Sequence, residues 1–331
     1  MAPSVLYLGG TGTISAACVR ESLSLGWSVT ILNRGRTSAR PVPDGVEALQ
    51  ADLDDTAALR AVLKDRSFDV VCDFMSFTTD RLSRNVDLLR DHTGQYVFIS
   101  SASAYAKPVA SLPITESTPL RNPFWQYSRD KIACEDLLVR AFREQGFPAT
   151  IVRPSHTYDE VYVPLIGGWT ALARMIAGRP AIVPGDGTSL WTLTHASDFA
   201  YCFARLLGRA QAIGEAYHIT GDEVLPWNAI YTELAHAAGV DSPALVHVAS
   251  ETICRARPEL TGDLLGDKAH CVVFDNTKVR LLAPGFAQRV PFAQGTREIV
   301  AYHRAHPEAC VVDPALDAAF DRLATWTARE L

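Results

Sequence analysis

A tyrosine and a lysine four positions apart are the first side chains in this sequence that could do chemistry together. They bracket the segment Tyr127-Ser128-Arg129-Asp130-Lys131. Asn122 and Pro123 are typical of a helix start, and we predict a helix from there to about residue 145 that carries both side chains on one face. A nearby ammonium favours tyrosinate, so Lys131 is expected to lower the pKa of the Tyr127 phenol and make it a general acid or base. The alternative is an unrelated surface pair.

Hydroxyl groups follow an apolar run upstream of that segment. Residues 96–99 are Tyr-Val-Phe-Ile, and Ser100, Ser101 and Ser103 come directly after them. The carboxyl ends of parallel strands are where an open α/β sheet binds its ligands. Ser101 or Ser103 is therefore expected beside a cofactor, able to hydrogen-bond a substrate oxygen. The alternative is that these hydroxyls only satisfy loop backbone.

A glycine-rich turn follows the first apolar run of the chain. Residues 5–8 lead into Gly9-Gly10-Thr11-Gly12, and a helix is expected at residues 13–25. Gly9 and Gly12 allow the backbone to approach a pyrophosphate, whose negative charge is favoured at a helix N-terminus. Ser15 stands where the usual third glycine would be, and its small side chain still permits close packing. A turn that merely connects two elements is the alternative.

The elements that must position these groups alternate along the first half of the chain. Apolar runs predict strands at residues 5–8, 27–32, 46–51, 68–72, 96–100 and 150–153, with helices at residues 13–25, 56–64, 81–90 and 122–145. This alternation indicates an α/β fold with a Rossmann-type doubly wound parallel sheet. Beyond Pro154 the pattern weakens, and turns rich in glycine and proline divide the chain.

Several motifs occur in the order found in one enzyme family. They are Gly9-Gly10-Thr11-Gly12-Thr13-Ile14-Ser15, Asp52-Leu53, the serine segment at residues 100–105, Tyr127 to Lys131, Val152-Arg153-Pro154, Pro184-Gly185-Asp186-Gly187 and Thr194-His195-Ala196-Ser197-Asp198. On these residues the chain resembles an extended or atypical short-chain dehydrogenase/reductase of the NAD-dependent epimerase/dehydratase family. The resemblance implies an enzyme in which Tyr127 is the acid/base, Lys131 binds the nicotinamide ribose and Ser101 is the catalytic hydroxyl.

The resemblance also implies a cofactor site and a smaller C-terminal substrate domain. The residues expected at the cofactor are Gly9, Thr11, Gly12, Thr13, Ile14, Asn33, Arg34, Arg36, Asp52, Leu53, Ser100, Lys131 and Pro154. Residues 1–158 are expected to form the dinucleotide-binding domain, with its sheet completed by about 188–220 and 271–280. Within those two segments, residues 191–194, 217–219 and 275–278 are expected to return to the sheet. Residues 159–187, 221–270 and 281–331 would form the substrate-binding part.

The choice of cofactor depends on the end of the second strand, Leu32-Asn33-Arg34-Gly35-Arg36. NAD-binding folds usually present an acidic residue there to the ribose diol. Arg34 and Arg36 could instead bind a 2′-phosphate, because a guanidinium matches phosphate geometry. This favours NADP slightly over NAD. Two solvated loop arginines are the alternative.

Contacts to the substrate give weaker signals. Ser103, His156, Tyr158 and Trp191 are the candidates to touch a sugar or nucleotide-sugar, whereas Lys268 is expected at the solvated surface. No cysteine or histidine cluster predicts a metal site. The net charge of −6 over 331 residues disfavours nucleic acid as a partner, and no apolar run is long enough for a membrane span. Seven scattered cysteines fit a reducing, cytoplasmic compartment, and the resemblance implies a homodimer as one possibility.

Three functions remain open on these residues. An epimerase would oxidise a sugar hydroxyl to a transient ketone and reduce it again from the other face. A ketoreductase would use NADPH to reduce a sugar-like carbonyl once. The catalytic trio favours the epimerase, as does Ala102-Ser103 where dehydratases of the family carry Asp-Glu, and Arg34 and Arg36 favour the reductase. A non-catalytic RNA-binding or scaffold protein is a minor alternative, because it would not need the trio.

Overall fold

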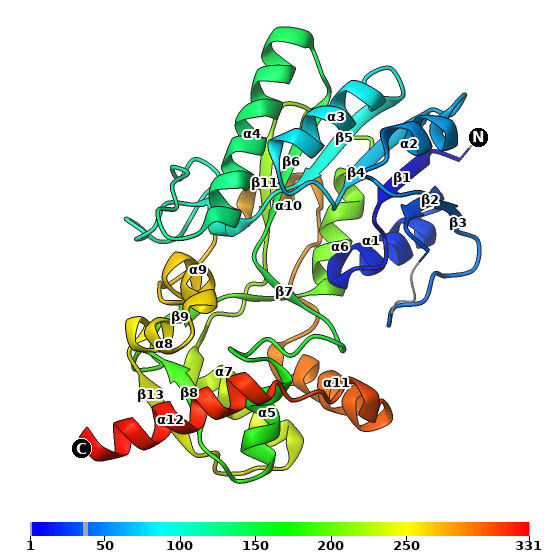
Figure 1. Cartoon of the computed structure of the whole chain (residues 1–331). Helices are drawn as coiled ribbons and strands as arrows, with labels where there is room; N and C mark the ends of the chain where they lie inside the picture. The colour runs from blue at the N-terminus through cyan, green and yellow to red at the C-terminus, as the bar shows by residue number, and fades with distance from the viewer. Residues whose placement is uncertain (1, 36–38, 331) are drawn as a thin grey trace.

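The computed structural model describes residues 2–35 and 39–330, and a parallel sheet of seven strands forms the upper part of this region (Figure 1). The strand order is β11-β6-β5-β4-β1-β2-β3. The strands are β1 Ser4–Leu8, β2 Ser28–Asn33, β3 Glu47–Gln50, β4 Phe68–Asp73, β5 Thr93–Ile99, β6 Ala149–Pro154 and β11 Ala216–Ile219. The order reverses between β1 and β4, which is where doubly wound sheets bind ligands. The predicted α/β, Rossmann-type fold is confirmed.

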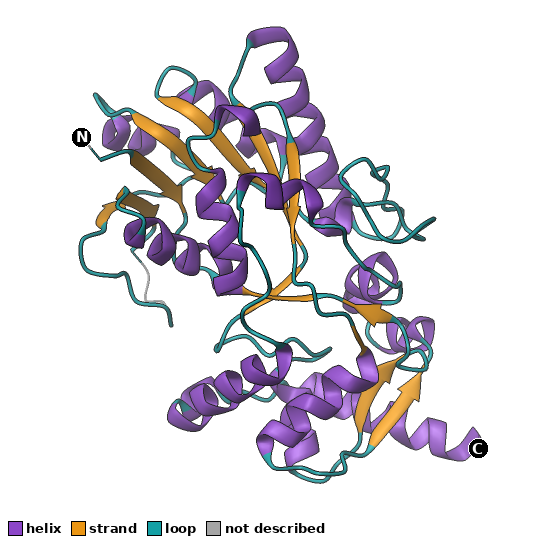
Figure 2. Ribbon diagram, turned by 180° about the vertical axis from the view of Figure 1, so that it is seen from behind, coloured by secondary structure: helices purple, strands orange, loops and turns teal. Residues whose placement is uncertain are grey.

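Helices cover both faces of this sheet because the side chains of each strand alternate (Figure 2). In β1, Val5 and Tyr7 join one hydrophobic core, whereas Leu6 and Leu8 join the other. The helices that contribute to the first core are α1 Thr13–Ser24, α6 Ala196–Leu206 and α10 Thr277–Leu282. Those that contribute to the second are α2 Thr56–Leu63, α3 Thr79–Leu89 and α4 Gln126–Gln145.

A third hydrophobic core lies in the lower part of Figure 1, beyond the carboxyl ends of the strands. Its elements are α5 Trp169–Ile176, α7 Trp227–Ala238, α8 Ser250–Ala256, α11 Phe292–Ala305, α12 Pro314–Glu330, β8 Ala181–Pro184 and β13 Leu245–Val248. Short elements connect this core to the sheet or decorate it: β7 His156–Tyr158, β9 Leu190–Trp191, β10 Leu193–His195, β12 Leu225–Pro226, α9 Thr261–Asp263 and a π-helical turn η4, Leu264–Lys268. Single 3₁₀ turns are η1 Ala102–Ala104, η2 Ala210–Ala212, η3 Pro258–Leu260 and η5 Pro307–Ala309.

Two segments expected in the central sheet lie elsewhere. Residues 191–194 divide between two small sheets, because β9 pairs with β12 and β10 pairs with β7. Residues 275–278 add no strand, since Thr277 begins α10. The Asn276 side-chain amide donates to the Thr220 carbonyl at 3.0 Å. A side-chain hydrogen bond therefore replaces backbone pairing with a further strand just after β11.

The helix that carries Tyr127 begins later than predicted. Its first residue is Gln126, not Pro123, and Trp125 is its N-cap. The Asn122 side chain accepts hydrogen bonds from the N–H groups of Phe124 and Trp125 at 3.1 Å each, which closes a separate turn before the helix. The Asn122 side chain therefore caps backbone N–H groups, as expected, but it caps this turn and not the helix.

Among the described residues, no helix has both the length and the apolar character needed to cross a membrane. The same residues contain no group of three or more His, Cys, Asp or Glu side chains that could hold a metal ion.

Candidate active site

A cavity of about 910 Å³ opens at the carboxyl edge of the central sheet. It collects most of the residues that the sequence singles out: Gly9, Thr11, Gly12, Thr13, Ile14, Asn33, Arg34, Asp52, Leu53, Ser100, Ser101, Ser103, Tyr127, Lys131, Pro154 and His156. They come from loops after five different strands and from the start of α4, so only the parallel sheet brings them together. Arg36 lies outside the described residues.

The glycine turn has the shape that a pyrophosphate requires. Gly9 and Gly10 adopt φ values of +98° and +124°, and a Cβ on Gly10 would lie 2.8 Å from Ile31 Cγ2. Gly12 is the N-cap of α1, and its N–H donates to the Ser15 hydroxyl at 2.9 Å. No acidic side chain lies in the first turn of α1, so the positive end of the helix dipole faces the cavity without a competing anion. These residues fit a dinucleotide.

Loops after β2 and β3 form the outer end of the cavity. Asn33 accepts a hydrogen bond from the Gly35 N–H at 2.8 Å, which fixes the turn that carries the exposed Arg34. Asp52 is exposed and Leu53 is buried next to it. A carboxylate and an apolar side chain at this edge suit the amino group and the ring of an adenine. Arg34 lines the same end of the cavity and forms no ion pair with another described residue.

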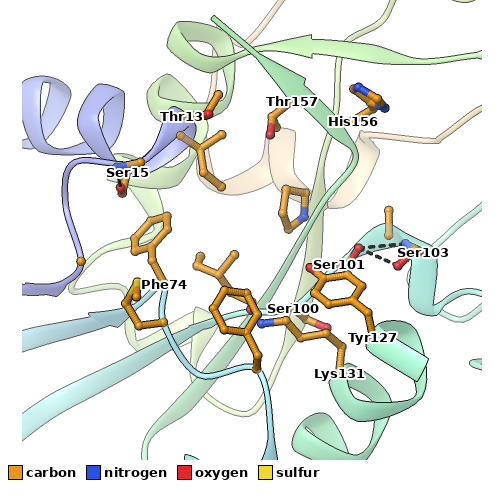
Figure 3. A pocket seen from close by; sticks show the side chains of 18 of the residues that line it. Thr13, Ser15, Phe74, Ser100, Ser101, Ser103, Tyr127, Lys131, His156 and Thr157 are labelled. Atoms are coloured by element: carbon orange, nitrogen blue, oxygen red, sulfur yellow. Dashed lines mark hydrogen bonds between the residues drawn. The ribbon is translucent and has the colours of Figure 1, made fainter. Parts of the chain in front are cut away.

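Tyr127 and Ser101 lie close together at the inner end of the cavity (Figure 3). The Ser101 hydroxyl lies 2.8 Å from that of Ser103, which lies 2.7 Å from that of Ser128. Ser101 also accepts from the Ser103 N–H at 3.1 Å, so η1 holds its side chain in place. The phenol thus sits at one end of a chain of hydroxyls.

Lys131 is fixed by backbone carbonyls. Its ammonium donates to the Ser76 and Ile99 carbonyls at 2.7 Å each and lies 5.9 Å from the centre of the Tyr127 ring. Burial lowers the pKa of Lys131 to about 8. An ammonium has three N–H groups, so one remains for a ligand hydroxyl.

The pKa of Tyr127 is shifted upward, which corrects the sequence-based expectation. Burial raises this pKa and the negative charge of Asp267 raises it further, while the hydrogen bond from Ser101 acts in the opposite direction. The expectation that Lys131 would lower it is wrong for the chain by itself, because the lysine is held by two carbonyls and the phenol is largely removed from water.

Two predicted substrate contacts lie behind the cavity wall. Tyr158 is 1% exposed and packs edge-on against His195 and Phe292. Trp191 stacks on Trp227 with ring centres 5.3 Å apart. Both are core aromatics, since large apolar rings on the short strands β7 and β9 are needed to fill the space between the two parts of the molecule.

Several residues that line the cavity were not predicted to do so, among them Trp125, Tyr162, Asp263, Asp267 and Lys268. Lys268 is 5% exposed, which contradicts its expected place at the surface. The only local signal was the closely spaced acidic and basic side chains between Gly262 and His270. Their position depends on a π-helical turn that no periodicity predicts.

Comparisons with known proteins agree with this geometry. The profile of the NAD dependent epimerase/dehydratase family matches residues 5–220. A 2'-dehydrokanamycin reductase from Streptomyces kanamyceticus is 29% identical over 71% of this chain and 66% of its own length. Chloroplast stem-loop binding protein of 41 kDa b from Arabidopsis thaliana is 27% identical over 73% of this chain and 65% of its own. The chain thus spans just under two thirds of each of these relatives.

Among solved structures, the epimerase Mth375 from Methanothermobacter thermautotrophicus superposes with a TM-score of 0.75 at 16% identity, over 93% of this chain and 94% of that one. This likeness shows that the two proteins share a fold. The chain belongs to the NAD-dependent epimerase/dehydratase family.

Proposed function

We propose that this enzyme interconverts a ketone and a secondary alcohol on a sugar-like substrate, with net reduction as its physiological direction. The observation that carries the proposal is that Ser101, Tyr127 and Lys131 lie together at the inner end of a cavity whose other end is the glycine turn. When bound, the nicotinamide supplies hydride to the carbonyl carbon. Every other part of the reaction is assigned to side chains of this chain.

Tyr127 is proposed to donate the proton. As hydride reaches the carbon, the carbonyl oxygen gains negative charge and takes the phenolic proton, so the C–O double bond becomes a single bond to a hydroxyl. Burial keeps the Tyr127 phenol protonated, which is the form that reduction needs at its start. Ser101 can hold the same oxygen, and the hydroxyls of Ser103 and Ser128 support Ser101 from behind.

Lys131 is proposed to orient the cofactor ribose with its remaining N–H group and to stabilise the phenolate that Tyr127 becomes. Its two carbonyl contacts place the ammonium 5.9 Å from the Tyr127 ring centre. Arg34 is proposed to favour NADPH, because it is exposed at the outer end of the cavity and a guanidinium matches the geometry of a phosphate. The name of the kanamycin-related relative supports both a reductive direction and a sugar ring as substrate.

Epimerisation is the second candidate, because the family profile spans most of the chain and the same trio serves both reactions. An epimerase must first deprotonate an alcohol, and it needs a substrate that can present both faces of a ketone without leaving. The name of the Streptomyces relative, a reductase, and the position of Arg34 at the outer end of the cavity rank reduction first. A binding protein without activity ranks last, since it would not need a buried lysine at a pKa of about 8 beside a phenol.

The nature of the bound cofactor tests this ranking. Purified protein is denatured and any released dinucleotide is identified by mass, and the intact protein is then titrated with NADPH and NADH. We expect exchangeable cofactor and a preference for NADPH. Stoichiometric NAD that stays bound through turnover would favour the epimerase, and a protein that bound no dinucleotide would refute an enzymatic role at the glycine turn.

A further inference from the structure

The end of the cavity beyond Tyr127 is formed by residues 261–268, which we call the substrate-end segment. It consists of α9 and the π-helical turn η4, and π-helical turns often mark functional sites. Gly262 and Gly266 let it lie directly on Trp125, since Cβ atoms on these glycines would be 2.2 Å from Trp125 Cδ1 and 2.8 Å from Trp125 Cβ. The Asn122 amide fixes it through a 2.7 Å hydrogen bond to the Gly266 carbonyl. The segment is therefore placed firmly beside the start of α4.

This segment brings two carboxylates into the cavity, and each already faces a lysine. Asp263 is paired with Lys268, and Asp267 lies 3.4 Å from the ammonium of Lys107. The lysine side chains are 6% and 0% exposed, so neither can turn to solvent. Charge at this end of the cavity is thus balanced within the protein before any ligand arrives.

The other lysine and arginine side chains in the described cavity wall either bind protein groups or lie away from the substrate-end segment. Lys131 is held by two carbonyls beside Tyr127. Arg81 binds Asp54 at 2.6 Å, and Arg34 follows β2 at the adenine end. A nucleoside diphosphate at the substrate end would bring further negative charge next to Asp263 and Asp267, whose charges are already matched by those of Lys268 and Lys107.

The same region offers groups that suit hydroxyls and amines. Carboxylate oxygens accept several hydrogen bonds, and Asp267 is 18% exposed on its side chain. His156 Nε2 is buried and has no hydrogen-bond partner in the described structure, although His156 lines the cavity. Burial and the charge of Lys268 lower the pKa of His156 well below its ordinary value, so it is a neutral imidazole. The rings of Trp125 and Tyr162 add flat apolar surface.

We infer that the substrate is an unphosphorylated glycoside, bound through hydroxyl or amino groups to Asp263 and Asp267, and not a nucleoside diphosphate sugar. The inference rests on the proposed function for the position of the reacting carbon. Because it concerns only the substrate end of the cavity, the inference and the proposed function can be refuted separately.

Isothermal titration with the cofactor site filled by NADPH tests the inference. The probes are methyl glucoside, methyl glucosaminide, UDP-glucose and UDP. We expect the two glycosides to bind at least about tenfold more tightly than the two uridine nucleotides, which is about 1.4 kcal/mol. Tighter binding of UDP-glucose, or competition by UDP alone, would overturn the inference and leave the reductase proposal intact. If the protein bound the glycosides but no dinucleotide, the reductase proposal would be overturned and the inference about the substrate would stand.

A variant pair tests the charge argument without depending on the chosen sugar. Asp263→Asn combined with Asp267→Asn keeps the shape of both side chains and frees Lys268 and Lys107 from their carboxylate partners. We expect the double variant to gain about tenfold or more in UDP affinity and to lose glycoside affinity, with NADPH binding unchanged. Asp241→Asn, at an exposed site outside the cavity, is the matched control. Unchanged UDP affinity in the folded double variant would contradict the inference.

Discussion

Replacing Tyr127 by phenylalanine removes one oxygen and leaves the rest of the site in place. The ring keeps its neighbours, because Trp125 and Phe77 lie 4.9 Å and 6.3 Å from its centre. The Ser101 hydroxyl keeps its contact with the Ser103 hydroxyl at 2.8 Å. No buried group is therefore left without a hydrogen bond, and we expect the free energy of unfolding to change by no more than about 1.5 kcal/mol.

The effect on turnover should be far larger. General acid catalysis contributes about 10²- to 10⁴-fold, so the barrier should rise by about 3 to 5 kcal/mol. The assay is the initial rate of NADPH oxidation at saturating ketone, together with the dissociation constant of NADPH. We expect kcat to fall within that range while NADPH affinity stays the same. Tyr201→Phe is the matched control, since the Tyr201 hydroxyl contacts only the Pro284 carbonyl outside the cavity. A Tyr127→Phe enzyme that kept kcat within about threefold of the parent would refute the role of the phenol.

The remaining predictions concern the cofactor, the buried lysine and the support of the serine loop. Arg34→Ala should weaken NADPH binding about tenfold and leave NADH binding unchanged, because a charge-assisted contact to phosphate is worth about 1.5 kcal/mol or more; equal losses for both cofactors would contradict it. Lys131 has a pKa of about 8 in the folded chain against an ordinary 10.5, so the unfolded chain binds more protons between these values. The contribution of Lys131 to the free energy of unfolding should therefore rise with pH across that window. In urea unfolding, the stability of the parent relative to Lys131→Met should therefore increase as pH rises, and a difference that does not change with pH would show that the lysine is not desolvated. Glu135→Ala should lower the free energy of unfolding by about 3 to 5 kcal/mol, because Arg153, bound to Glu135 at 2.6 Å and 5% exposed, would be left as a buried unpaired charge. Asp136→Ala, on the exposed side of the same helix, should be close to neutral, and a similar loss there would point to the helix and not to the ion pair.

The order of elements could be read from the sequence because local patterns define it. Six apolar runs and the helices between them predicted the strands β1 to β6 to within a few residues, and the glycine turn and the serine loop fell at strand ends as expected. Strands that are buried on both faces are apolar along their whole length, so they can be recognised in the sequence. The short strands β9 and β10 were misplaced, because two or three residues carry too little pattern to say which partner they pair with.

Protonation states could not be obtained in the same way. The spacing of Tyr127 and Lys131 correctly put both on one helix face, yet the pKa of the phenol moves up instead of down. That direction depends on how much water the fold removes and on which carbonyls hold the lysine. Those carbonyls belong to Ser76 and Ile99, which lie 55 and 32 residues away from Lys131 in the chain.

The sequence by itself determined the fold class and the family, and it predicted the residues that line the glycine-turn end of the cavity, since these follow from strand periodicity and from motifs that are contiguous in the chain. Only the tertiary structure decided what lies opposite Tyr127. Asp263, Asp267 and Lys268 reach the cavity because a π-helical turn packs against Trp125 through Gly262 and Gly266, and Lys107 meets Asp267 from a segment far away in the sequence. The charge balance that we propose to select the substrate depends on this packing and on the Lys107–Asp267 contact, which no local pattern encodes.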